Sequence, residues 1–202
     1  MIALPKPTYI VAPVALAFFI AQSAHAELIR WSEPALDVLP GESVAGLALL
    51  DESVTPVFGY SLEIEIVPLE GSMGTLTVDT VATNFFDSRN LISQGGAMRD
   101  AMFSVIQPTE VGVFISTNTA DLSTVTAAPG VNDALAQVVF AASADAFGDF
   151  EVRFGSGTAL SDGLGFPVEH ATQTLTITVI PAPASIGLLL GAGEIRRRRR
   201  GS

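Results

Sequence analysis

The residues of this chain that could do acid–base chemistry are carboxylates, and two pairs of them stand at alternate positions. Glu63 and Glu65 form one pair, and Asp149 and Glu151 form the other. Alternate side chains on a strand share one face and lie about 7 Å apart, a spacing that a pair of glycosidase acids could use. Acids on a solvated strand have the same spacing. We therefore interpret both pairs as surface residues, with a carbohydrate-active enzyme as a weaker alternative.

The sequence lacks the residues that most other catalytic devices need. It has no cysteine, which excludes disulfides, thiolate catalysis and zinc–thiolate sites. His25 belongs to an N-terminal segment that resembles a leader, so a Ser-His-Asp triad would need His170, and no nucleophile elbow accompanies it. Residues 27–180 contain no lysine, which removes Schiff-base chemistry. The sequence predicts that the protein is not an enzyme and that His170 is a surface residue in a turn.

Two binding chemistries stay open. Oxygen ligands in turns could hold Ca²⁺, although no Asp-x-Asp-x-Asp-Gly loop is present and such residues are also ordinary turn formers. No cofactor is therefore predicted, and calcium remains an alternative. Trp31 and Tyr60 are the candidates for an aromatic platform under a sugar ring, although Tyr60 alternates with Leu62 and so favours the core. The turn residues considered for calcium are Asn132, Asp133, Asp149 and Asp162.

The charge of residues 27–180 limits what they can bind. Four arginines stand against 20 acidic residues, which gives this region a net charge of −16. Such a surface repels nucleic acid and anionic lipid. The partners that fit are neutral polymers, cations or basic protein faces.

The elements that must position these residues read as strands. Apolar and β-branched residues alternate in runs that glycine and proline separate, while 88–99 reads as a loop or short helical turn. Eight or nine short strands predict an all-β fold with a single β-sandwich, of jelly-roll type. The predicted strands cover 43–50, 57–67, 75–81, 102–107, 111–117, 134–142, 150–154 and 172–180.

Both ends of the chain carry features of sorting signals. Lys6, an apolar run over 10–20 and the small residues Ala24 and Ala26 predict a signal peptide over 1–26. The domain then covers 27–180. The tail, 181–202, has a proline-rich break, a short apolar segment over 184–193 and a basic cluster that cannot cross a bilayer. Its defining residues are Pro181, Ala182, Pro183, Arg196, Arg197, Arg198, Arg199 and Arg200.

This order of features resembles the C-terminal signal of the bacterial PEP-CTERM family, with Pro-Ala-Pro in place of Pro-Glu-Pro. The resemblance implies export from a Gram-negative cell, cleavage by signal peptidase, transient anchoring in the inner membrane by a C-terminal sorting helix, and processing by an exosortase. The protein would then reach the cell surface or the extracellular matrix. Families with this tail occur in bacteria that make exopolysaccharide, so that polymer or a surface protein is an implied partner.

A second resemblance extends over the domain. The Pro40-Gly41 turn, the Gly59-Tyr60 step into a long strand, the run Ala134 to Phe140 and the Leu160 to Gly165 turn are similar to features of cohesin-like, carbohydrate-binding-type domains. The resemblance implies a cohesin-like sandwich with a binding role. We therefore expect an exported, non-enzymatic structural or adhesive protein, and as the alternative a binding module for a glycan or a dockerin-like protein.

Overall fold

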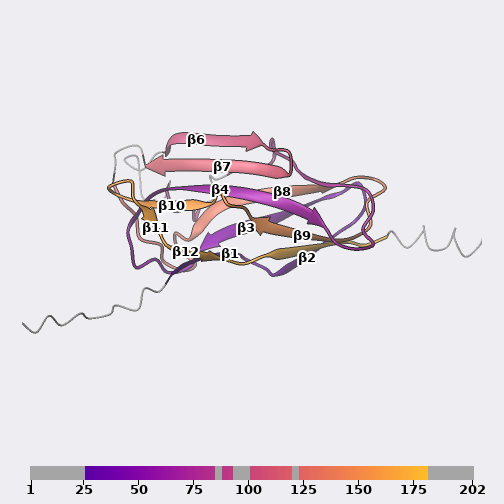
Figure 1. Ribbon diagram of the computed structural model, residues 1–202, viewed down its shortest axis with the longest axis horizontal. Coiled ribbons are helices and arrows are strands. Elements are labelled where there is room, and N and C mark those ends of the chain that lie inside the picture. The colour runs from indigo at the N-terminus through magenta and orange to yellow at the C-terminus, as the bar shows by residue number, and fades with distance from the viewer. Residues whose placement is uncertain (1–25, 85–87, 93–100, 120–122, 182–202) are drawn as a thin grey trace, which may run out of the picture.

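Thirteen strands make up the part of the chain that the computed structural model describes, residues 26–84, 88–92, 101–119 and 123–181 (Figure 1). The predicted all-β class is confirmed, and the described residues include no helix long and apolar enough to cross a membrane. The strands are β1 (Glu27–Trp31), β2 (Ala35–Val38), β3 (Ser43–Leu50), β4 (Val57–Pro68), β5 (Leu76–Val78), β6 (Ala101–Pro108), β7 (Gly112–Thr119), β8 (Ala134–Ala142), β9 (Gly148–Phe154), β10 (Ala159–Asp162), β11 (Pro167–Val168), β12 (His170–Thr172) and β13 (Leu175–Val179).

The strands form two facing sheets, as the sandwich prediction required. The five-stranded sheet has the order β12-β1-β3-β8-β5. The eight-stranded sheet has the order β11-β10-β4-β9-β13-β2, and β7 and β6 extend it beyond the other edge of β4. Strand β4 is its centre, because β7 pairs along one edge while β10 and β9 share the other edge.

The alternation of apolar and acidic residues in β4 suits a strand at the centre of the eight-stranded sheet. Leu62 and Ile64 are fully buried between the sheets, whereas Glu63 and Glu65 point to the outer face. A strand with this pattern can sit in the middle of a sheet that has one dry and one wet face. The strand ends one residue later than predicted.

The first two strands and the last two strands of the domain pair in parallel. β1 pairs with β12 in the five-stranded sheet, and β2 pairs with β13 in the eight-stranded sheet. Both segments therefore cross from one sheet to the other. Because the two segments run in the same direction, the chain enters the domain at one end and leaves it at the opposite end (Figure 1).

We name these ends by the terminus found there. The N-terminal pole holds Glu27 and the turns 51–56 and 162–166, because β4 begins there and β10 ends there. The C-terminal pole holds Ile180 and the turns 39–42, 69–74 and 143–147.

Aromatic side chains connect the two sheets through the core. Tyr60 of β4 donates its hydroxyl hydrogen bond to the carbonyl oxygen of Leu135 on β8. Asn90 supports this contact, since its Nδ2 donates to the Tyr60 hydroxyl at 3.2 Å and to the Leu135 oxygen at 3.0 Å. Trp31 stacks on Phe154 of the opposite sheet with ring centroids 5.1 Å apart, and its edge meets Phe140. Aromatic pairs of this kind stabilise beyond the area that they bury.

Replacing the Tyr60 hydroxyl tests this inter-sheet contact. We expect Tyr60→Phe to lower the free energy of unfolding by about 1–2 kcal/mol at neutral pH, because a buried hydrogen bond is lost. Burial raises the pKa of Tyr60 far above its ordinary value of 10, an effect that the Asn90 hydrogen bond only partly offsets. The folded state therefore holds this proton more tightly, so its stabilisation is present below pH 10 and lost as the pH rises further.

Urea denaturation of the chain from Glu27 onward at neutral and alkaline pH measures both effects. That chain has one tyrosine and no lysine or cysteine, so tyrosinate absorbance reports Tyr60 alone. Above pH 10 the wild type should lose stability more steeply than Tyr60→Phe. A tyrosinate signal at pH 10 in the folded protein would contradict the buried hydroxyl.

Candidate binding site

A groove of about 410 Å³ lies on the eight-stranded sheet, toward the N-terminal pole. Three adjacent strands contribute to it: β7, β4 and β10. Its lining is mostly small residues, which leave the sheet surface low at this point. They belong to the segments 58–61, 116–118 and 159–161.

Glycine at position 59 makes the close approach of β4 and β7 possible. A Cβ at Gly59 would lie 2.8 Å from the Cβ of Asn118 and 2.9 Å from the carbonyl oxygen of Thr117. Backbone oxygens hold the neighbouring hydroxyls. The Ser161 hydroxyl donates to the carbonyl oxygen of Gly59 at 3.1 Å, and the Ser61 hydroxyl donates to the carbonyl oxygen of Gly157 at 2.8 Å. The floor of the groove is thus a fixed backbone surface with few long side chains.

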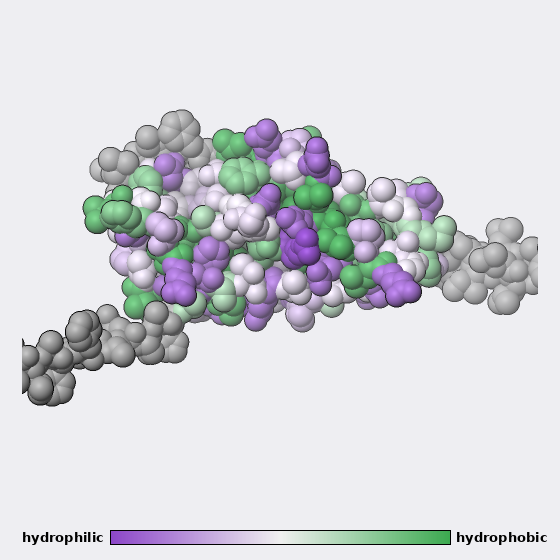
Figure 2. Space-filling view, viewed as in Figure 1, coloured by the Kyte–Doolittle hydropathy of each residue, from purple (hydrophilic) through white to green (hydrophobic). Residues whose placement is uncertain are grey.

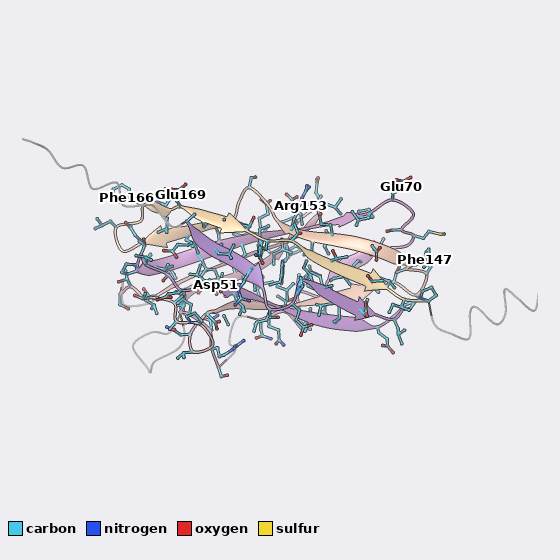
Figure 3. All side chains as sticks on the ribbon, turned by 90° about the horizontal axis from the view of Figure 1, so that it is seen from below. Asp51, Glu70, Phe147, Arg153, Phe166 and Glu169 are labelled. Carbon is cyan, nitrogen blue, oxygen red and sulfur yellow. The ribbon has the colours of Figure 1, made fainter. Side chains whose placement is uncertain are left out.

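Exposed apolar residues lie at the N-terminal pole, the end of the domain nearest the groove. The turn 162–166 follows directly on β10, which lines the groove, and it carries Leu164 and Phe166. Figure 2 shows hydrophobic residues at the left-hand end of the molecule, and Figure 3 places Phe166 there, near Glu169. Val54 and Val131 are further exposed apolar residues in turns of this pole. The groove and this turn were not predicted from the sequence.

The predicted carboxylate pair of β4 lies beside the groove, and each of its two carboxylates already accepts a hydrogen bond from a nearby donor. The backbone N–H of Gly157 donates to Glu63 Oε2 at 2.6 Å, and Arg153 Nε donates to Glu65 Oε2 at 2.7 Å. A Cβ at Gly155 would come within 2.6 Å of an oxygen from each carboxylate, so both acids close over this glycine. The arrangement is a hydrogen-bonded surface cluster in which neither acid stands free above a cleft.

The other candidates for chemistry are spread over the domain. In the second carboxylate pair, Asp149 accepts a hydrogen bond from the Thr178 hydroxyl at 2.7 Å. His170 begins the short strand β12 and pairs with Glu27, which corrects the prediction of a turn. Its Nδ1 lies 3.1 Å from the Val168 carbonyl oxygen, so the ring is held by backbone.

The turn residues considered for calcium do not converge. Asp149 lies at the C-terminal pole, whereas Asn132 and Asp133 lie in a turn, and Asp162 at the end of β10, at the N-terminal pole. Their oxygens accept backbone N–H groups of their own turns: Ala128 for Asn132, Gly130 for Asp133, and Leu164 and Phe166 for Asp162. Within the described ranges no three metal-ligating side chains come together.

Trp31 and Tyr60 are both core residues. Each is only 3% exposed, so neither ring can offer a face to a sugar in this structure. Gly46 gives the Trp31 indole its room, because a Cβ there would lie 3.2 Å from the ring. The expected position of Tyr60 in the core is observed, and the aromatic platform does not fit the geometry of either ring.

The predicted sorting residues fall mostly outside the described part of the chain. Ala26 is exposed and directly precedes β1, while Pro181 follows β13 at the C-terminal pole. The remaining ones, Ala24, Ala182, Pro183 and the five arginines from Arg196 to Arg200, are not described by the structure.

Comparison with known proteins shows the fold. No family model matches the chain, and no curated protein matches it. Solved cohesin modules do: CaCohA2 from Clostridium acetobutylicum has a TM-score of 0.55 at 18% identity, and the match covers 76% of this chain and 92% of that module. A type III cohesin of the ScaE anchoring scaffoldin from Ruminococcus flavefaciens gives 0.53 at 12% identity, over 78% and 89%.

A third similar structure contains a bound partner. The third ScaB cohesin of R. flavefaciens, in complex with a group 1 dockerin, has a TM-score of 0.52 at 13% identity, and the match covers 76% of this chain and 94% of that one. The described domain is therefore a cohesin-like β-sandwich, as the sequence predicted.

Substitution of Trp31 separates a core role from a ligand platform. Trp31→Ala should lower the free energy of unfolding by about 3–5 kcal/mol, because it removes a large buried ring from between the sheets. Trp31→Phe should cost less, since it keeps an aromatic ring beside Phe154. Chemical denaturation measures both. Trp31 is the single tryptophan, so a change of its fluorescence on adding a neutral polysaccharide would contradict the core assignment.

Proposed function

We propose that this chain is an exported, non-enzymatic module that binds a protein partner at its N-terminal pole. Its tail anchors it transiently in the inner membrane, until an exosortase cleaves the tail and the module reaches the cell surface or the extracellular matrix. The observation that carries the proposal is the groove over β4, β7 and β10, together with the exposed apolar turn that follows β10, on a cohesin-like sandwich. An interface needs an apolar centre within a polar rim, and this pole offers both.

The charge of the domain indicates the chemistry of the partner. Arg30, Arg89 and Arg153 are the arginines within the described ranges, and each is paired with an acid. The surface therefore presents a net excess of carboxylates, which favours a partner with a basic or neutral face. The similar ScaB structure was solved with a dockerin, and a dockerin-like surface protein is the partner class that we propose here.

A binding role accounts for the described residues better than catalysis does. The acids of β4 are held by Gly157 and Arg153, and His170 pairs with β1 and does not line the groove. A structural or adhesive role in an exopolysaccharide matrix is consistent with the same surface. A glycan ligand remains the second candidate, because the groove is lined by small polar residues that can accept a flat neutral polymer.

A charge placed in the groove tests the binding surface. Ala159 is exposed in the groove, and Ala45 is exposed on the outer face of the other sheet, so Ala159→Arg and Ala45→Arg are matched variants. We expect Ala159→Arg to weaken partner binding at least about tenfold, because a buried, uncompensated charge opposes the interface.

Cross-linked capture from a surface extract of the producing cells, followed by calorimetry with the identified protein, measures this effect. A partner retained by the wild type and by Ala45→Arg but lost by Ala159→Arg supports the proposal. Equal loss in both variants would contradict the assigned surface. Saturable binding of exopolysaccharide alone would favour the glycan alternative.

The intact mass of the protein, recovered separately from membranes and from the extracellular fraction, tests export and processing. We expect an extracellular form that starts at Glu27 and ends near 181–184, after cleavage by signal peptidase and an exosortase. A mass that extends to Ser202 and is found only in membranes would mean that the tail is an uncut anchor.

A further inference from the structure

Exposed apolar side chains form a row across the C-terminal pole. Leu69 follows the end of β4, Phe147 precedes β9, Ile180 follows β13, and Leu39 follows β2. These four strands are consecutive neighbours in the eight-stranded sheet. Adjacent strands lie about 4.8 Å apart, so the four residues occupy neighbouring positions along one edge of the domain.

Backbone hydrogen bonds hold this row in place. Ile180 N donates to the Val38 oxygen and Leu69 N donates to the Asp149 oxygen, both at 2.9 Å. Met73 joins the row through a reciprocal backbone pair with Phe147, with N···O distances of 2.9 and 3.0 Å. We call Leu39, Leu69, Met73, Phe147 and Ile180 the C-terminal rim. Their exposed fractions lie between 39% and 64%.

The position of the rim relative to the tail indicates what covers it. Figure 3 shows Phe147 at the end of the domain where the tail leaves, opposite Phe166. The apolar segment 184–193 begins four residues after Ile180, so an extended connection places its start within about 14 Å of the rim. A tail inserted in a bilayer would therefore hold the rim at the bilayer surface.

We propose that the C-terminal rim rests in the interfacial layer of the membrane and supplements the tail as an anchor. This inference rests on the proposed membrane attachment of the tail. A ten-residue segment forms about 15 Å of helix, half of a hydrocarbon core of about 30 Å. Apolar side chains that enter the interface add binding in proportion to the area they bury, so the rim compensates for the short tail.

Acidic residues at the same pole determine which lipids suit the rim. Glu42 and Glu70 are exposed in the turns beside it, and Asp145 is exposed next to Phe147. Anionic headgroups repel these carboxylates. The occupant is therefore a surface of zwitterionic lipid, and added anionic lipid weakens the contact.

The chain from Glu27 to Ser202 with phosphatidylcholine vesicles tests the proposal. The chain has no cysteine, so Met73→Cys and Leu164→Cys each accept one environment-sensitive dye, at the rim and at the opposite pole. We expect the dye at position 73 to shift to shorter wavelength on binding and the dye at 164 to remain unchanged. Phosphatidylglycerol also attracts the five arginines of the tail, so its effect is read on vesicle-bound protein alone, whose dye shift at position 73 should be smaller at low salt.

Matched double variants measure the contribution of the rim to affinity. Leu69→Ser with Phe147→Ser removes one leucine and one phenylalanine from the rim, and Leu164→Ser with Phe166→Ser removes the same pair from the other pole. The rim variant should bind vesicles about tenfold more weakly than the wild type, and the control should bind as the wild type does.

Three results would overturn the proposal. Vesicle-bound protein with no shift at position 73 means that the tail anchors alone, and the proposed attachment stands without the rim. No vesicle binding at all overturns both the attachment and the rim. A shift at 73 before vesicles are added places the tail or a second copy on the rim instead of lipid. Partner capture by the N-terminal pole is measured separately and is unaffected by any of the three.

Discussion

The parallel pairing of the first and last segments closes the sandwich, and most other features of the domain depend on it. β1 and β12 complete the five-stranded sheet, while β2 and β13 complete the other. The pairing also makes Glu27 a structural residue: it is buried, and its Oε1 accepts the N–H groups of Val54 and Thr55 at 3.0 Å each. The first described strand therefore begins at the residue that follows the predicted signal-peptide cleavage.

The same pairing gives the molecule a direction. Two adjacent antiparallel strands would bring the termini to one end, whereas parallel segments place them at opposite ends. The groove and its apolar turn then belong to the pole where the chain enters, and the rim belongs to the pole where it leaves. A module attached through its tail would present the groove away from the membrane, so one topological feature separates the proposed binding surface from the proposed anchoring surface.

Local pattern was enough to predict the strands that carry the core. The predicted strands 43–50 and 134–142 agree with β3 and β8 at both ends, because each is a long run of apolar and small residues between turn signals. Strands β1, β2 and β10 to β12 were not predicted. They have two to five residues, and β1 and β2 lie on either side of Pro34. Apart from the short β10–β11 hairpin, they pair with strands far along the chain, so no local periodicity indicates them.

The sites divide in the same way between local and long-range causes. Residue type was enough to single out Trp31, Tyr60 and the β4 acids as candidates. Their roles depend on burial and on hydrogen-bond partners, and strands distant in sequence supply both. The groove could not be predicted from residue type, because Gly59 and Ala159 have no functional group that marks them as site residues. They matter because β7 and β10 bring other small residues beside them. A binding surface made by the absence of large side chains becomes visible only when the register of its strands is known.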